Sequence, residues 1–191
     1  MMDLAVFPLN TVLFPGGVLP LRIFETRYLD MVRRCMREDQ PFGVCLMLAE
    51  NPGVSAARVC EVGTWGRIVD WEQRSDGLLG ITVMGEQRFR ICRSWTQPDG
   101  LNMAEVEELD WPDEVTLPRE YEPLAGLLHR LLQELPEPYR LLQGDLQRAG
   151  WVSARLSELL PLELPQKQML LEMDNHLNRL QLLRETMLGD T

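Results

Sequence analysis

With 191 residues, of which 45% are hydrophobic and 25% are charged, the chain carries enough apolar side chain for a packed core in one large domain or two small ones. The formal net charge of −10 repels polyanions, and no run of Lys or Arg supplies the cations that nucleic acid or an anionic membrane surface would require. No apolar run approaches the ~20 residues that span a bilayer, and residues 1–10 show no export signal, so we expect a cytoplasmic protein.

The first forty residues predict a β-hairpin followed by an amphipathic helix. Two short apolar runs, Leu4–Leu9 and Val18–Ile23, flank the turn sequence Phe14-Pro15-Gly16-Gly17, where proline fixes φ and glycine admits positive φ. From Glu25 to Glu38 the apolar spacing becomes helical, with a stripe made of Tyr28, Leu29, Val32, Cys35 and Met36.

Residues 42–109 predict further strands, curled into a small sheet or barrel. The longest run, Leu78–Cys92, has Gly85 in its middle, where a missing side chain is typical of a bulge or bend. The other strand-like runs are Phe42–Ala49, Val62–Trp71 and Leu101–Leu109, and the turn sequences Ser75-Asp76-Gly77 and Pro98-Asp99-Gly100 lie between runs.

After Pro118 the apolar spacing is helical. It predicts one helix over Tyr121–Leu135, a second that begins after Gly144 or Gly150 and ends at Pro161, and a third from Pro165 to Gly189. Three amphipathic helices with short connections indicate a bundle. We therefore expect a β-rich domain at residues 1–116 and a helical domain at residues 117–191.

Several segments resemble, in order and spacing, landmarks of the Lon protease N-terminal, substrate-binding domain family. The most specific is FPLNTVLFPGGVLPLRIFETRY at residues 7–28, and the others are Phe42–Val44, Val62–Thr64, Asp76-Gly77, Gly85–Phe89, Ala104–Val106, Leu156–Leu160, Pro165–Gln168 and Leu170–Glu172. The resemblance implies an α+β fold, with a PUA-like antiparallel β pseudobarrel and one amphipathic helix followed by a C-terminal helical bundle. It also implies a role in holding polypeptide substrates.

A complete Lon protease also needs an ATPase and a Ser-Lys peptidase, and these residues match neither. The single lysine, Lys167, follows no glycine-rich phosphate loop, so ATP hydrolysis is not expected. As a catalytic base it would have to serve Ser55, Ser75, Ser94, Ser153 or Ser157, and we expect a solvated lysine with too high a pKa. The sequence thus indicates a stand-alone, bacterial-type family member with no catalytic residues.

No cofactor or metal site is expected either. Cys35, Cys45, Cys60 and Cys92 form no CxxC pair, and we expect reduced, mostly buried thiols. His129 and His176 lie among leucines and are expected to be partly buried, hydrogen-bonded residues. Carboxylate clusters such as Asp113-Glu114 are typical of a hydrated face.

The IFETRY segment, residues 23–28, is expected to be structural. We expect Glu25 to lie at the exposed N–H groups of the helix start, Arg27 to pair with a barrel carboxylate, and Tyr28 to be buried. Ile23 and Phe24 are expected to close the barrel against the helix. A polypeptide-binding surface should be apolar and adaptable, which favours methionines, the Leu13–Val18 loop with Phe14 pointing outward, or the cleft between the two domains. Arg88 and Arg90, alternating with Phe89, are further candidates. The candidate contact residues are Phe14, Arg88, Arg90, Met103, Met169 and Met173.

Two functions remain open from the sequence. The first is a non-catalytic module that recognises exposed or partly unfolded polypeptide segments, as an adaptor to a separate protease or chaperone. The second is a PUA-like module for RNA or a small molecule, although the acidity of the chain argues against RNA. A salt titration separates them, because RNA binding weakens steeply with salt and apolar peptide binding does not.

Overall fold

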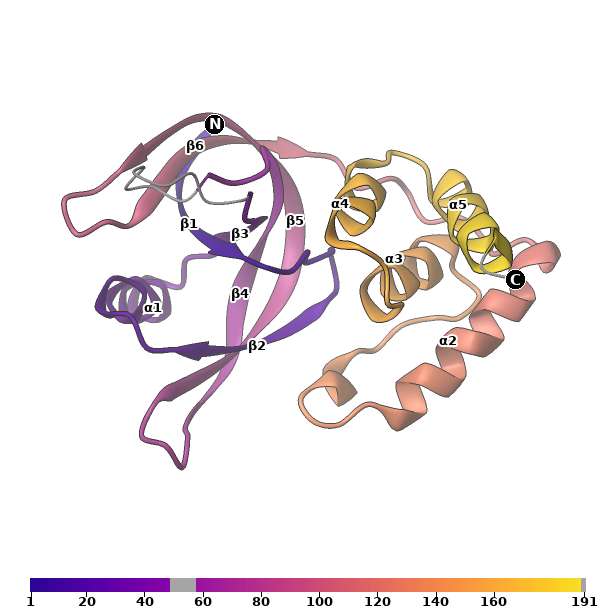
Figure 1. The fold of residues 1–191 in the computed structure, drawn as a ribbon, viewed down its shortest axis with the longest axis horizontal. Helices are drawn as coiled ribbons and strands as arrows, with labels where there is room; N and C mark the ends of the chain where they lie inside the picture. The colour runs from indigo at the N-terminus through magenta and orange to yellow at the C-terminus, as the bar shows by residue number, and fades with distance from the viewer. Residues whose placement is uncertain (49–57, 190–191) are drawn as a thin grey trace. The chain divides into compact units, whose positions relative to one another are not determined.

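The computed structural model describes residues 1–48 and 58–189 and shows a mixed α+β protein, with six strands and five α-helices among these residues (Figure 1). The chain divides into two compact units, Met1–Asp110 and Trp111–Thr191. The first contains all the described strands and α1, and the second contains α2 to α5. None of the described helices is long and apolar enough to cross a membrane.

The strands of the first unit form a sheet that closes on itself. In chain order they are β1 (Met2–Leu9), β2 (Val18–Ile23), β3 (Phe42–Leu46), β4 (Val62–Gln73), β5 (Leu79–Thr96) and β6 (Asn102–Leu109). The spatial order is β2-β5-β4-β3-β1-β6, and β6 pairs back with β5. Five strands therefore form a ring, and β2 extends from β5 as an end strand. Among the pairs of described strands, only β1–β3 is parallel.

The predicted hairpin between the first two strands is wrong. Both strands exist, but β1 pairs with β3 and β6, whereas β2 pairs with β5. The connecting loop is tied to β5, because Gly16 N donates to Gly85 O and Gly85 N donates to Gly17 O, each at 2.8 Å. Thr64 Oγ1 also donates to Leu13 O at 2.6 Å. The loop thus lies against the sheet, and the Phe14 ring is fully buried rather than pointing outward.

The irregularity expected at Gly85 is confirmed. The β4–β5 register shifts between Trp65 and Gly66, which pair with Gln87 and Gly85. β5 continues four residues beyond its expected end at Cys92, because residues 93–96 pair with β6. The glycine turns at Gly77 and Gly100 are also confirmed, with φ of 82° and 86°. β3 ends at Leu46, and the expected strand end at Ala49 lies outside the described residues.

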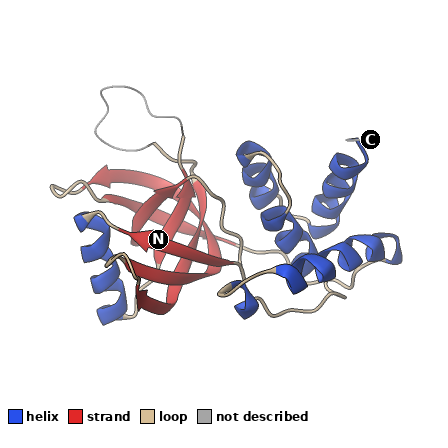
Figure 2. Ribbon diagram, turned by 60° about the horizontal axis from the view of Figure 1, so that its bottom comes forward, coloured by secondary structure: helices blue, strands red, loops and turns tan. Residues whose placement is uncertain are grey.

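Helix α1 (Thr26–Glu38) lies against the sheet, as Figure 2 shows. Tyr28, Met31, Val32 and Cys35 are buried on it, and the helix ends at Asp39, whose φ of 50° is left-handed. The core around α1 also contains Ala5, Phe7, Leu13, Ile23, Phe42, Val44, Ile81, Val83 and Leu101. A second cluster inside the ring consists of Leu4, Val6, Cys45, Trp65, Phe89, Ala104 and Val106.

The second unit has α2 (Glu122–Glu134), α3 (Ala149–Leu159), α4 (Leu164–Glu172) and α5 (His176–Gly189). The expectation of one helix from Pro165 to Gly189 is wrong, because the chain becomes extended at Met173 and restarts after Asn175. The Asn175 side chain accepts the N–H groups of Leu177 and Asn178 and so caps α5. Arg179 donates to the carbonyls of Leu170 and Met173, which satisfies groups at the end of α4.

The second unit also includes the segment before Pro118. Leu117 N donates to Gln147 O at 2.7 Å and Ala149 N donates to Val115 O at 2.9 Å. Glu114 Oε2 accepts from Gly150 N at 3.0 Å, at the start of α3. These bonds place Trp111–Leu117 with the helices, so the compact unit begins at Trp111 instead of residue 117.

Candidate functional site

Two of the predicted contact residues lie in the interior. Phe14 is fully buried by the loop contacts with β5, and Arg88 is buried with its Nη2 donating to Asp110 O. The expectation that these two side chains face a partner is therefore wrong. Arg88 lies in the middle of the sheet, where it pairs with Thr64 on β4 and with Leu109 on β6.

The other predicted contact residues reach the surface to different extents. The Arg90 side chain is half exposed and its Nη1 lies 3.6 Å from Glu107 Oε1. Met103 is half-buried against the α1 core, Met169 on α4 is 48% exposed, and Met173 is half-buried after α4. Arg90 and Met103 belong to the first unit, and Met169 and Met173 belong to the second.

The IFETRY segment instead borders a groove of about 310 Å³ in the first unit. The end of β1 supplies Phe7, Pro8 and Leu9, the chain from β2 into α1 supplies Leu21–Glu25, Arg27 and Tyr28, and Met47 follows β3. The lining is mostly apolar, with charged groups of both signs. Its outstanding side chain is Phe24, which is 68% exposed.

Sequence reasoning placed Phe24 in the core, and this was wrong. Strand alternation could have found it, because Ile23 is buried and the next side chain of an extended segment points to the opposite side. An aromatic ring this exposed carries apolar area that a ligand could cover.

Charged and aromatic groups fix the shape of the groove. Arg27 Nη2 lies 2.7 Å from Glu25 Oε2, Arg27 Nη1 donates to Gly100 O at 2.9 Å, and the guanidinium lies 4.9 Å from the Tyr28 ring centre. The Tyr28 and Phe7 ring centres are 4.0 Å apart. Burial raises the pKa of the Tyr28 hydroxyl, with a smaller lowering by Arg27 and a further small rise from Glu25.

These contacts correct two expectations for the segment. The Glu25 side chain makes no capping hydrogen bond to α1, and Arg27 pairs with Glu25 rather than with a barrel carboxylate. The burial of Tyr28 and Ile23 is confirmed. The segment therefore contains buried residues that anchor α1 and one exposed ring, that of Phe24, at the groove.

Lys167 and the two serines of α3 serve structural contacts in the second unit. Lys167 is half-buried, not solvated as expected, and its Nζ donates to Glu158 O at 2.6 Å. Burial lowers the pKa of its ammonium group, against a smaller raising effect of Glu158. The hydroxyls of Ser153 and Ser157 are buried and donate to Gly150 O and Ser153 O, at 3.1 and 2.8 Å.

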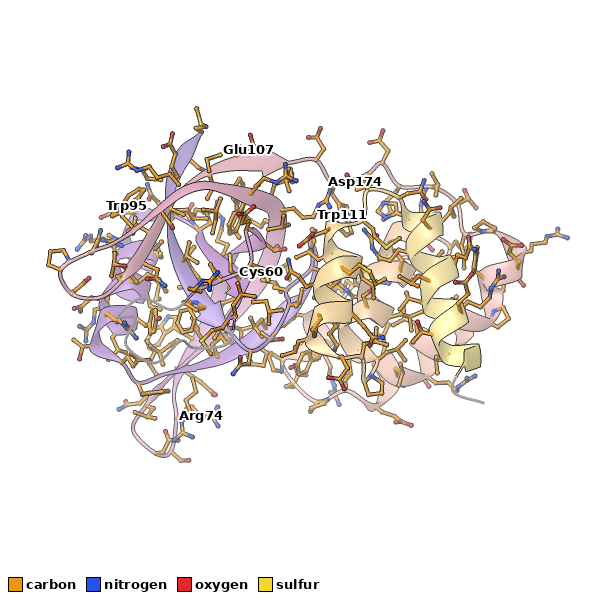
Figure 3. All side chains as sticks on the ribbon, turned by 45° about the horizontal axis from the view of Figure 1, so that its top comes forward. Cys60, Arg74, Trp95, Glu107, Trp111 and Asp174 are labelled. Carbon is orange, nitrogen blue, oxygen red and sulfur yellow. The ribbon has the colours of Figure 1, made fainter. Side chains whose placement is uncertain are left out.

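His176 is a buried, hydrogen-bonded residue, as expected. Its Nε2 lies 2.9 Å from Pro112 O and its Nδ1 lies 2.9 Å from Arg179 Nη1. A carbonyl only accepts and a guanidinium only donates, so the ring is neutral with its proton on Nε2. The Arg179 guanidinium lies 4.5 Å from the Trp111 ring centre, and Figure 3 labels Trp111 in this unit. This cluster joins the start of the unit to α5.

The chain thus has two compact units, and its β-rich unit carries an apolar groove with an exposed aromatic ring. Residues 3–188 match the family described as ATP-dependent protease La (LON) substrate-binding domain. The chain belongs to this family.

Solved structures agree with this assignment. A Lon N-terminal domain protein from Xanthomonas campestris is 39% identical, with a TM-score of 0.78 over 96% of this chain and 97% of that one. The N-terminal domain of a Mycobacterium avium complex Lon protease, at 21% identity and a TM-score of 0.60 over 95% of this chain and 96% of that one, is similar in fold alone.

Curated relatives are longer than this chain. Lon protease of Anaeromyxobacter dehalogenans is 27% identical over 176 residues, which are 88% of this chain and 21% of that protein. Protein cereblon of Danio rerio is 34% identical over 112 residues, which are 56% of this chain and 25% of that protein. The chain thus spans about a fifth to a quarter of the relatives that it matches.

Proposed function

We propose that the chain is a polypeptide-binding module and that exposed apolar segments of unfolded or flexible proteins bind in the groove beside Phe24. The family is the substrate-binding part of Lon, not its catalytic part, which supports this function. The observation that carries it is the 68% exposure of Phe24 at the edge of an apolar groove. We further propose that the closed sheet is a PUA-like pseudobarrel and that the helical unit is a bundle.

The groove has the chemistry expected for varied polypeptides. Phe7, Leu9 and Tyr28 give it a largely apolar lining, and the flexible side chain of Met47 can adapt to side chains of different shape. Arg22 and Glu25 supply opposite charges at the groove, so neither sign of charge on a client is strongly rejected. Broad and weak recognition follows.

The proposed module is non-catalytic and acts as an adaptor, passing its clients to a separate protease or chaperone in the cytoplasm. The accessible members of the predicted set, Arg90, Met103 and Met169, and the half-buried Met173 are each proposed as secondary contacts. Each is tested by alanine substitution in the same binding assay as Phe24.

The size of the Phe24 contribution can be worked out. A phenylalanine side chain presents roughly 200 Å², so 68% exposure leaves about 140 Å² to cover, worth at most about 3.5 kcal/mol at ~25 cal/mol/Å². Because association costs consume part of this, we expect Phe24→Ala to raise Kd about tenfold. The assay is fluorescence anisotropy with labelled, reduced and carboxymethylated α-lactalbumin, which stays unfolded.

The matched control is Trp71→Ala. Trp71 is also an exposed aromatic residue, at 58%, but it lies on β4 and does not line the groove. Both variants should keep wild-type stability to within about 0.5 kcal/mol, because the replaced rings are exposed. An unchanged Kd for Phe24→Ala, or an equal loss of affinity in both variants, contradicts the proposed site.

A further inference from the structure

The first unit contains a second and larger cavity, of about 490 Å³, beside the β5–β6 hairpin. Residues 91–96 of β5 line one side, and Arg58, Val59 and Glu61 line another. Figure 3 labels Trp95 on this hairpin. No member of the 310 Å³ groove lines this cavity, so the two are separate sites.

Where β5 borders the cavity, one of its edges pairs with no strand in residues 1–48 and 58–189. Pairing between β4 and β5 ends at Val62–Arg90, followed by the bond from Ile91 N to Glu61 O. Beyond this point the only strand in the described residues that pairs with β5 is β6.

The direction of the free backbone groups follows from the register. Gln97 N donates to Leu101 O, and in an antiparallel ladder the hydrogen-bonded pairs alternate. Trp95 and Arg93 therefore bond to β6, whereas the N–H and C=O groups of Ser94 and Thr96 point away from it. Ser94 and Thr96 are exposed and both line the cavity. A row of such groups is a template for another extended chain.

The charges at the cavity select the kind of chain. Among the arginines of the first unit, only Arg34, Arg58 and Arg93 make no ion pair within the described residues, and two of these three line this cavity. Arg93 lies over the Trp95 ring at 5.7 Å, which keeps its guanidinium beside an aromatic surface. The cavity lining thus has two arginines against one carboxylate, Glu61, and this positive excess in a chain with a net charge of −10 favours an anionic ligand.

We propose that this cavity binds an extended polypeptide segment with acidic side chains, which adds as a strand to the Ser94–Thr96 edge of β5. Backbone hydrogen bonds to Ser94 and Thr96 give sequence-tolerant affinity, and carboxylates of the segment pair with Arg58 and Arg93. Val59 and Ile91, both half-buried, contact the apolar side chains that alternate with the acidic ones. This inference rests on the proposed function as a polypeptide-binding module.

The test uses the full chain and a labelled eight-residue peptide of alternating valine and glutamate, measured by fluorescence anisotropy. A second peptide has lysine for glutamate, and a third is N-methylated at every residue, which removes all its N–H donors. The variants are Thr96→Pro, which deletes a donor that β6 does not use, and the double variant Arg58→Glu/Arg93→Glu. Arg34→Glu is the matched control, because Arg34 is equally unpaired but does not line this cavity.

The valine–glutamate peptide is expected to bind the wild type, and both cavity variants should raise its Kd about tenfold or more. Arg34→Glu should leave it unchanged, the double variant should prefer the lysine peptide, and the N-methylated peptide should not bind. The N-methylated peptide needs only the wild-type protein, so its result counts even if a variant fails to fold.

Three results would overturn the inference. The valine–glutamate peptide does not bind, or the N-methylated peptide binds equally well. The third is that no peptide binds and sedimentation shows the wild type to be a dimer that Thr96→Pro dissociates. The last result would assign the edge to a second copy of this chain. If Phe24→Ala weakens binding of unfolded α-lactalbumin while the peptide fails to bind, the proposed function stands and only this inference falls. If neither ligand binds the wild type, both fall.

Discussion

Gly85 is the position where one added methyl group should damage the β-rich unit most clearly. A Cβ at Gly85 would lie 2.4 Å from Phe14 O and 3.1 Å from the Leu13 side chain. Neither neighbour can move freely, because Phe14 is fully buried and the backbone of Gly85 forms hydrogen bonds of 2.8 Å with Gly16 and with Gly17. Gly85→Ala must therefore push the loop off β5.

The cost combines two effects. Overpacking of a close contact costs roughly 1–3 kcal/mol, and each weakened hydrogen bond adds about 0.5–1.5 kcal/mol. We expect a loss of about 3 kcal/mol in the free energy of unfolding, which lowers the Tm of a unit of this size by roughly 13 °C. Differential scanning calorimetry measures the change, because the two units need not unfold together.

Gly126→Ala is the matched control with the opposite sign. Gly126 lies inside α2, and an added Cβ would meet nothing within 4 Å. Alanine is the better helix former, so this variant should gain about 0.5–1 kcal/mol. The reasoning is refuted if Gly85→Ala unfolds within about 0.5 kcal/mol of the wild type, or if both substitutions shift the Tm in the same direction.

Three further predictions concern other parts of the chain. Arg179→Lys should destabilise the helical unit by about 3 kcal/mol, because one ammonium group cannot replace the four hydrogen bonds that Arg179 donates to Leu170, Met173, Ser153 and His176. Chemical denaturation followed by far-UV circular dichroism measures this loss, and a denaturation midpoint equal to that of the wild type would contradict it. The Tyr28 phenol contributes stability below pH 10.0, its unfolded-state pKa, and this stability is lost as the pH rises through the raised folded-state pKa. Tyr28→Phe should therefore remove part of the loss of stability at alkaline pH. Identical dependence of unfolding free energy on pH in the two proteins would argue against this. A thiol reagent should label the exposed Cys92 in the native protein. It should label the buried Cys45 only after unfolding, because burial strongly raises the pKa of that thiol. Fast labelling of Cys45 in the native protein would disprove its burial in the core.

Local patterns were enough to predict most of the elements. The apolar spacing from Glu25 to Glu38 predicted α1, and glycine with its neighbours predicted the turns at Gly77 and Gly100, because each depends on residues close together in the chain. The irregularity at Gly85 was visible for the same reason. The motif at residues 7–28 also identified the family, which the match over residues 3–188 shows.

The tertiary structure decided which strands pair and which side chains remain accessible. The sequence predicted β1 and β2 as partners, yet the Gly16–Gly17 loop bonds to β5 and carries Phe14 into the core. The break between α4 and α5 depends on Arg179, which bonds to carbonyls nine and six residues away. Arg88 is buried for the same kind of reason, since its side chain donates to the carbonyl of Asp110, 22 residues away. Periodicity reports which residues are apolar, whereas accessibility depends on contacts between segments distant in sequence, and only the folded chain brings those segments together.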